Sequence, residues 1–219
     1  MQLFFITRKR KAFRSQENLI KSRIFGATFE RTRMKFGVVV FPGSNCDDDT
    51  VGVIQSLGHE AVKLWHKDTD LQNCEFIIIP GGFSYGDYLR SGAIARFSPI
   101  MDHVIEHAKN GGYLMGICNG FQVLVEAHLL PGVLLRNHTQ KFISKNIFLK
   151  AATNNSLLTH SLNTQKAYKV PIAHAEGRYF TDEKTLASLK ANDQILFYYC
   201  DADGQVTEES NPNGSLLNI

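Results

Sequence analysis

Strand-like apolar runs and helical patterns take turns along the chain from residue 35 onwards. Residues 36–41 form a continuous apolar run, while residues 47–57 and 93–109 carry apolar side chains at helical spacing. This alternation is typical of βαβ units, in which helices cover both faces of a parallel sheet. The other elements predicted in this half are strands at residues 61–65, 76–79 and 113–117 and a helix at residues 120–127.

Beyond residue 132 the apolar runs become shorter and turn residues more frequent. This change predicts antiparallel strands, or a meander, added to the same sheet rather than further βαβ units. No internal repeat is visible, and no second domain with its own core is expected. The sequence therefore predicts an α/β fold with a mostly parallel sheet. The added strands are expected at residues 133–135, 141–149, 169–172 and 195–199.

Residues 1–33 differ from the rest of the chain, because they lack a sustained helical or strand period. They contain nine basic and two acidic residues, which leaves residues 34–219 with a net charge of −4, although the whole chain is +3. We expect this basic segment to lie outside the fold, or to result from the choice of start codon, with the folded domain at residues 34–219. An arginine-rich organelle transit peptide is the alternative.

Charge and composition exclude several classes of protein. With the first segment set aside, the mildly acidic remainder has no electrostatic basis for binding nucleic acid. No stretch approaches the roughly 18 apolar residues that span a bilayer, and no secretory signal pattern is present. The four cysteines form no C-x-x-C pair, so we expect reduced thiols in a cytoplasmic protein.

The most informative motif is Gly116-Ile117-Cys118-Asn119-Gly120, which lies between a predicted strand and a predicted helix. Its spacing is that of a nucleophile elbow, with a cysteine as the nucleophile. A helix N-terminus favours the reactive thiolate, and the N–H of Asn119 would face a tetrahedral oxyanion. The alternative is that Cys118 is an inert core cysteine. Cys46, Cys74 and Cys200 are assigned no chemistry.

A second motif follows the neighbouring parallel strand. Residues 80–87 read P-G-G-F-S-Y-G-D and leave the carboxyl edge of the sheet, where open α/β sheets bind ligands. The Gly81-Gly82 pair would allow a backbone N–H to approach a substrate closely and to supply a second oxyanion donor. A cysteine elbow and a glycine turn on one sheet edge together predict an acyl-transfer site.

These motifs closely resemble those of the class I (triad) glutamine amidotransferases. Within that group the chain is similar, from Met34 to its last residue, to the glutaminase subunits of small-type phosphoribosylformylglycinamidine synthase, the PurQ type. The resemblance implies a flavodoxin-like, three-layer α/β/α sandwich for the predicted α/β fold. The stretches that carry it are F-P-G-S-N-C-D (41–47), P-G-G-F-S-Y-G-D (80–87), G-I-C-N-G-F-Q (116–122) and P-I-A-H-A-E-G-R (171–178).

By this resemblance Cys118 attacks the side-chain amide of L-glutamine, which gives a γ-glutamyl thioester and ammonia. Gly82 and Asn119 supply the oxyanion N–H groups, and Gln122 lies close to the bound glutamine. Ammonia then passes to a large synthetase subunit, which works with a small bridging subunit and uses ATP and Mg²⁺ to make formylglycinamidine ribonucleotide in purine (IMP) biosynthesis. No cofactor or metal is expected on this chain.

The resemblance places the general base and its orienting carboxylate in a P-H-P-E motif, which we expect beyond Ile219, so the domain is expected to be incomplete at its C-terminus. Within the sequence, His174-x-Glu176 is the alternative pair, although the stretch matches a separate family segment that shapes the glutamine site or a partner interface. His138 fits either a site wall or a solvated turn. Two other functions remain open, a non-catalytic amidotransferase-fold scaffold and a cysteine hydrolase of the intracellular protease or chaperone type.

Overall fold

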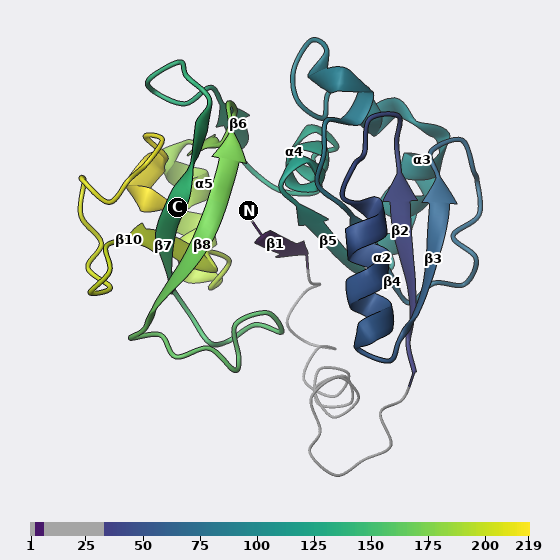
Figure 1. Ribbon diagram of the computed structural model, residues 1–219, viewed down its shortest axis with the longest axis horizontal. Helices are drawn as coiled ribbons and strands as arrows, with labels where there is room; N and C mark the ends of the chain where they lie inside the picture. The colour runs from purple at the N-terminus through teal and green to yellow at the C-terminus, as the bar shows by residue number, and fades with distance from the viewer. Residues whose placement is uncertain (1–2, 7–32) are drawn as a thin grey trace. The chain divides into compact units, whose positions relative to one another are not determined.

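The computed structural model describes residues 3–6 and 33–219, which form two compact units, Leu3–Leu130 and Pro131–Ile219 (Figure 1). Each unit is built around its own sheet or sheets. Within these described ranges, no helix is both long enough and apolar enough to cross a bilayer.

The first unit contains a five-stranded sheet in the order β1-β5-β4-β2-β3. Strands β2 to β5 run parallel, whereas β1 pairs antiparallel with β5 at the edge. The order of the four parallel strands is that of the flavodoxin-like sheet, in which the strand order reverses between β2 and β4. The strands are β1 (Leu3–Ile6), β2 (Lys35–Val40), β3 (Glu60–Trp65), β4 (Phe76–Ile79) and β5 (Tyr113–Ile117).

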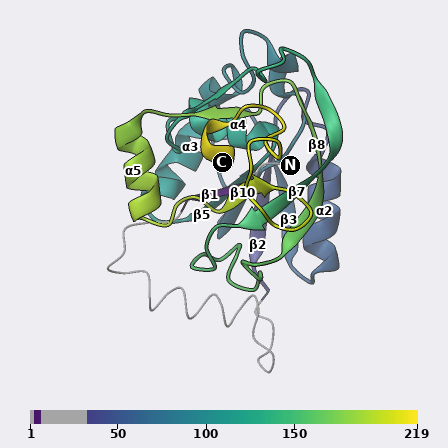
Figure 2. The ribbon, with the colours of Figure 1, turned by 90° about the vertical axis from the view of Figure 1, so that its left-hand side faces the viewer.

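Helices cover both faces of this sheet, as the strand alternation requires. Phe36 and Val38 of β2 pack on one face with Ile54 of α2, whereas Val39 packs on the other face with α3 and α4. Figures 1 and 2 show α2 and α3 on opposite sides of the sheet. The predicted three-layer α/β/α arrangement is therefore confirmed for this unit. Its helices are α2 (Asp47–Ser56), α3 (Pro99–Lys109) and α4 (Asn119–Glu126).

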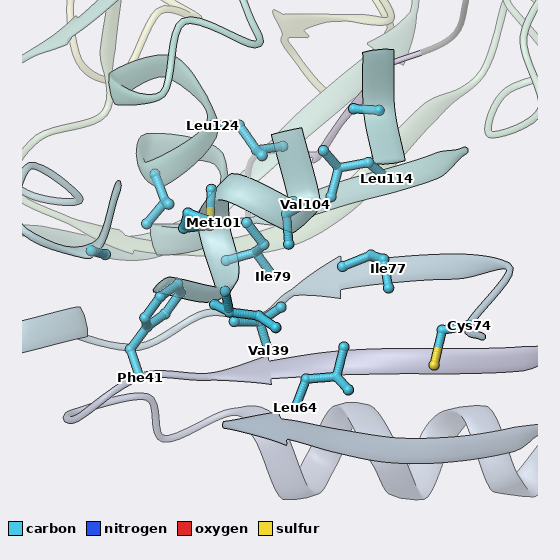
Figure 3. Close-up of a cluster of buried hydrophobic side chains, with 14 residues drawn as sticks. Val39, Phe41, Leu64, Cys74, Ile77, Ile79, Met101, Val104, Leu114 and Leu124 are labelled. Atoms are coloured by element: carbon cyan, nitrogen blue, oxygen red, sulfur yellow. The ribbon is translucent and has the colours of Figure 1, made fainter. Parts of the chain in front are cut away.

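The larger core of the unit lies between the sheet and helices α3 and α4 (Figure 3). Ile77 and Ile79 of the central strand β4 are fully buried there. Met101 and Val104 of α3 and Leu124 of α4 close over them and are equally inaccessible to solvent. Burial of these apolar side chains stabilises β4, and it thereby fixes the position of the loop that follows the strand.

The helix predicted over residues 93–109 is interrupted in the structure. A 3₁₀ turn spans Ala95–Phe97, Ser98 is extended with ψ of 140°, and α3 begins only at Pro99. Proline has no N–H to continue a helix and disfavours helical geometry at the residue before it. Ser98 therefore separates two helical segments that share one apolar pattern.

The second unit corrects the expectation that the later strands join the parallel sheet. They form two separate antiparallel sheets, ordered β10-β7-β8 and β6-β9, and Ile147, Ile172 and Tyr199 form a small core of their own. One helix, α5, and strand β9 were not predicted. The elements are β6 (Val133–Leu135), β7 (Ile143–Ala151), β8 (Ala167–His174), β9 (Arg178–Phe180), α5 (Glu183–Ala191) and β10 (Phe197–Cys200) (Figures 1 and 2).

Asparagine side chains hold much of the second unit together. Asn137 and Asn213 are fully buried. The Asn137 amide donates to the carbonyl oxygens of Lys141 at 2.8 Å and His174 at 2.9 Å, and the Asn213 amide donates to Gly177 O at 2.8 Å. The His174 and Gly177 carbonyls lie 37 and 36 residues from the amides that bind them, so these bonds join distant segments that no sheet ladder connects.

The basic segment at residues 1–33 is described only in part. Leu3–Ile6 form strand β1, so these four residues belong to the sheet and not to an extension outside the fold. Residues 1–2 and 7–32 lie outside the described residues, and the expectation for them stays a prediction.

The core makes a first prediction about stability. Leu64 of β3 is fully buried against the α3 side of the sheet, and Leu57 at the end of α2 is 53% exposed. Leu64→Ala should lower the free energy of unfolding by about 3 kcal/mol, because it removes apolar contacts and leaves a cavity. Leu57→Ala should change it by less than about 0.5 kcal/mol. Urea titrations followed by circular dichroism would test this, and equal effects would contradict the assignment of the core.

Candidate active site

Three loops meet at the carboxyl edge of the parallel sheet, because β2, β4 and β5 all end there. The loop after β2 is bonded to the loop after β4 by backbone hydrogen bonds. Phe83 N–H donates to Gly43 O at 2.9 Å, and Tyr85 N–H donates to Pro42 O at 2.6 Å. This edge includes the point at which the strand order reverses, where doubly wound sheets bind their ligands.

Cys118 follows β5 directly and is the N-cap residue of α4. Its backbone angles are φ 53° and ψ −111°, a conformation that costs a non-glycine residue energy and that recurs at functional sites. The side chain is partly exposed. The first N–H groups of a helix have no partner within it, so the N–H of Asn119, the first residue of α4, points away from the helix body.

The elbow requires glycine on both sides of the cysteine. A Cβ atom on Gly120 would lie 1.9 Å from the carbonyl oxygen of Ile79 in β4. A Cβ atom on Gly116 would lie 2.6 Å from the carbonyl oxygen of Gly120. Strand β5, helix α4 and the end of β4 therefore approach at backbone contact distance, which fixes the position of Cys118 next to the loop that follows β4.

The side chain of Asn119 ties this loop to the helix. Asn119 is 1% exposed, and its Oδ1 accepts a hydrogen bond from the backbone N–H of Ser84 at 3.0 Å. Its Nδ2 donates to Asp87 Oδ1 at 3.0 Å and to Gln122 Oε1 at 2.9 Å. Both N–H groups of the amide and its oxygen are bonded, so Asn119 orients the 80–87 loop and the Gln122 side chain together. The sequence motif gave no sign of this role.

The Gly81-Gly82 turn lies beside the cysteine. The position of a Cβ atom on Gly81 is 3.4 Å from Cys118 Cβ. Gly82 has φ +142°, and a Cβ atom there would lie 2.7 Å from Asn45 Oδ1. Only glycine adopts this conformation at so close an approach. The structure thus brings Cys118, the Gly81-Gly82 turn, Asn119 and Gln122 to one sheet edge, while the chemical roles given to them stay predictions.

His174, the alternative base, ends strand β8 of the second unit. Its Nδ1 lies 3.1 Å from Asn137 Oδ1, and its Nε2 is buried without a hydrogen-bond partner. Because the Asn137 nitrogen donates elsewhere, its oxygen must accept, so His174 carries its proton on Nδ1. Burial lowers the pKa of His174 to about 4, which keeps the ring neutral at pH 7. The Glu176 carboxylate lies 4.0 Å from Arg136 Nε.

The remaining histidine prediction concerns His138. His138 is exposed and lies in a turn, and its N–H donates to Asn213 O at 3.0 Å. This agrees with the prediction of a solvated turn. Across the parts of the chain that the structure describes, no three His, Cys, Asp or Glu side chains converge as metal ligands.

Fold and site together define an α/β protein with a cysteine at a strand-to-helix elbow on the carboxyl edge of its parallel sheet. Residues 33–219 match the CobB/CobQ-like glutamine amidotransferase domain. The phosphoribosylformylglycinamidine synthase subunit PurQ of Koribacter versatilis is 52% identical over 187 residues, which cover 85% of this chain and 81% of that protein. That of Moorella thermoacetica is 53% identical over 85% of this chain and 79% of its own length.

A solved structure agrees with these relatives. The structure of PurLQS from Thermotoga maritima matches with a TM-score of 0.69 and 38% identity, covering 80% of this chain and 78% of that chain. The chain belongs to the glutamine amidotransferase family, and the resemblance predicted from its motifs is confirmed.

Two glycines test the elbow geometry. Gly120→Ala should lower the free energy of unfolding by about 3 kcal/mol or more, because the new Cβ meets the Ile79 carbonyl oxygen. Gly52 in α2 has nothing within 4 Å of its Cβ position, so Gly52→Ala should raise stability by about 0.5–1 kcal/mol. Chemical denaturation measures both. A Gly120→Ala protein as stable as the wild type would contradict the close approach.

The partly buried imidazole of His174 makes stability depend on pH. The pKa of His174 falls from its usual 6.5 to about 4 in the folded chain. The unfolded chain therefore binds more protons between pH 6.5 and 4, and stability decreases as the pH is lowered through that range. We expect a loss of about 2 kcal/mol, less than the full shift because the ring is partly exposed.

Urea midpoints between pH 7 and 4 would measure this effect. The pH dependence should be weaker in His174→Asn, whereas His138→Asn, which changes an exposed histidine, should keep the wild-type slope. Identical slopes in all three proteins would rule out the buried, neutral state of His174.

Proposed function

We propose that this chain is the glutamine-hydrolysing subunit of a phosphoribosylformylglycinamidine synthase. The observation that carries the proposal is the Cys118 elbow beside the Gly81-Gly82 turn, in a chain about half identical to PurQ subunits. Glutamine hydrolysis requires a nucleophile, donors for an oxyanion and a site for the substrate's side-chain amide. This sheet edge supplies candidates for each.

In the proposed mechanism the Cys118 sulfur attacks the side-chain amide carbon of L-glutamine. The negative charge on the carbonyl oxygen is stabilised by the N–H groups of Asn119 and Gly82. Collapse of this intermediate releases ammonia and leaves a γ-glutamyl thioester, which water hydrolyses to glutamate. Gln122, held by Asn119 Nδ2, borders the substrate.

The proton transfers require a base that is oriented by a carboxylate. We propose the histidine and glutamate of the family's P-H-P-E motif for this role. His174 is the second candidate: its Nε2 carries a lone pair, but its Nδ1 is oriented by the amide of Asn137 and not by a carboxylate.

The ammonia is proposed to pass to a synthetase subunit. Support comes from the relatives, which are subunits of a synthase, and from the Thermotoga maritima structure, which is of PurLQS. In this arrangement the large synthetase subunit and a small bridging subunit are the partners. The synthetase subunit uses ATP and Mg²⁺. A cytoplasmic location follows as part of the same proposal.

Affinity labelling tests the nucleophile. A glutamine analogue that carries a diazoketone in place of the amide should form one covalent adduct, on Cys118, because only that thiol lies at the substrate's reacting carbon. Excess L-glutamine should slow labelling at least about tenfold, and D-glutamine should not. Peptide mapping by mass spectrometry locates the adduct, and Cys118→Ala should remain unlabelled.

Three outcomes would contradict the proposal. Labelling confined to Cys46, Cys74 or Cys200 would assign the wrong nucleophile. Labelling of Cys118 that ignores L-glutamine would indicate a reactive thiol without a glutamine site. No labelling of any cysteine would favour the non-catalytic scaffold.

A further inference from the structure

A second cysteine lies beside the proposed nucleophile. The Cβ position of Gly81 is 3.4 Å from Cys118 Cβ and 3.5 Å from Cys46 Sγ. Because residue 81 is glycine, it places no side chain of its own at the position that both cysteines border. Cys46 is exposed and Cys118 is partly exposed, so small molecules in solvent reach both.

The backbone holds Cys46 in this position from both sides. Its N–H donates to Gly81 O at 3.3 Å. Its carbonyl oxygen accepts from Thr50 N–H at 3.1 Å and from Thr50 Oγ1 at 2.6 Å, since Cys46 is the N-cap residue of α2. The loop after β2 is thereby fixed to the loop after β4, and the Cys46 side chain is kept next to Cys118.

The surroundings of Cys46 disfavour its thiolate form. Burial, followed by the negative charges of Cys118, Asp49 and Asp47, raises the pKa of Cys46. Cys46 is therefore mainly a neutral thiol beside the nucleophile. A neutral thiol reacts slowly with an oxidant, so Cys46 is suited to a second step, the attack on an already oxidised Cys118.

We propose that Cys46 is a resolving cysteine for Cys118, so that a peroxide converts the pair into a reversible disulfide. The Cys118 sulfur attacks one oxygen of hydrogen peroxide, the O–O bond breaks, and hydroxide leaves to form Cys118 sulfenic acid. The Cys46 sulfur then attacks the Cys118 sulfur and displaces the hydroxyl group, which leaves as water. In sum, two thiols lose two electrons and two protons, and peroxide is reduced to two waters.

The disulfide would have two consequences for the site. It blocks the sulfur that attacks glutamine, so the subunit is inactive while oxidised. It also stops the oxidation of Cys118 at the disulfide, which added thiols reduce, before the irreversible sulfinic acid forms. The proposal goes beyond glutamine hydrolysis and shares with it only the requirement that Cys118 is reactive.

The other two cysteines serve as controls. Cys74 and Cys200 are buried, and burial raises the pKa of both, that of Cys74 to about 11. Among the described residues, no contact places either cysteine at the loops that follow β2, β4 and β5. Cys74→Ala and Cys200→Ala should therefore leave disulfide formation between Cys46 and Cys118 intact.

The experiment treats the full chain with hydrogen peroxide, blocks free thiols and maps peptides without reduction. In the wild type we expect the peptides of Cys46 and Cys118 to be joined, and dithiothreitol to restore both thiols. In Cys46→Ser we expect dimedone to trap sulfenic acid on Cys118, and longer exposure to give sulfinic acid that dithiothreitol does not reverse.

The proposal is overturned if Cys118 of the wild type reaches sulfinic acid as fast as it does in Cys46→Ser while Cys46 stays a free thiol. It is equally overturned if Cys118 does not react with peroxide. Labelling the same untreated sample with the glutamine analogue separates the two proposals. Labelled Cys118 without a disulfide removes only the resolving role, whereas loss of labelling removes the proposed function as well.

Discussion

The close approach of Gly120 to the carbonyl oxygen of Ile79 is the contact on which the site depends. It brings the start of α4 against the end of β4 with no side chain between them. Cys118 then has no room for an ordinary backbone conformation and adopts φ 53° and ψ −111°. The strain is sustained by the surrounding core, because β4 is buried along its whole length between two helical layers.

Once the elbow is fixed, polar contacts determine the rest of the site. The Asn119 amide joins the 80–87 loop to α4, and backbone bonds join that loop to the one after β2. The three loops therefore behave as one assembly at the edge of the sheet. Their relation to one another explains how a side chain 72 positions earlier in the sequence, Cys46, comes to lie beside Cys118.

Much of this arrangement was predictable, because it follows from local pattern. Strands β4 and β5 end where their apolar runs end, and the elbow follows from glycine spacing around Cys118. Other features depend on geometry that no local pattern contains. The partners of the Asn119 side chain and the neighbouring Cys46 required the folded chain, whereas the break before Pro99 could have been predicted from the proline itself. Helix α5 carried a readable signal, since Asp182 caps it by accepting from Thr185 N–H, but its apolar stripe is weak.

The two units differ in what maintains their form, and this bears on how each tolerates sequence change over evolutionary time. The first relies on apolar volume, which related side chains of similar size can refill with small losses. The second relies on amides such as Asn137 and Asn213, each of which serves particular carbonyl oxygens by direction and donor type. Even an isosteric aspartate or leucine there leaves buried acceptors unpaired. Fewer substitutions in the second unit therefore leave its stability unchanged, although it has the smaller core.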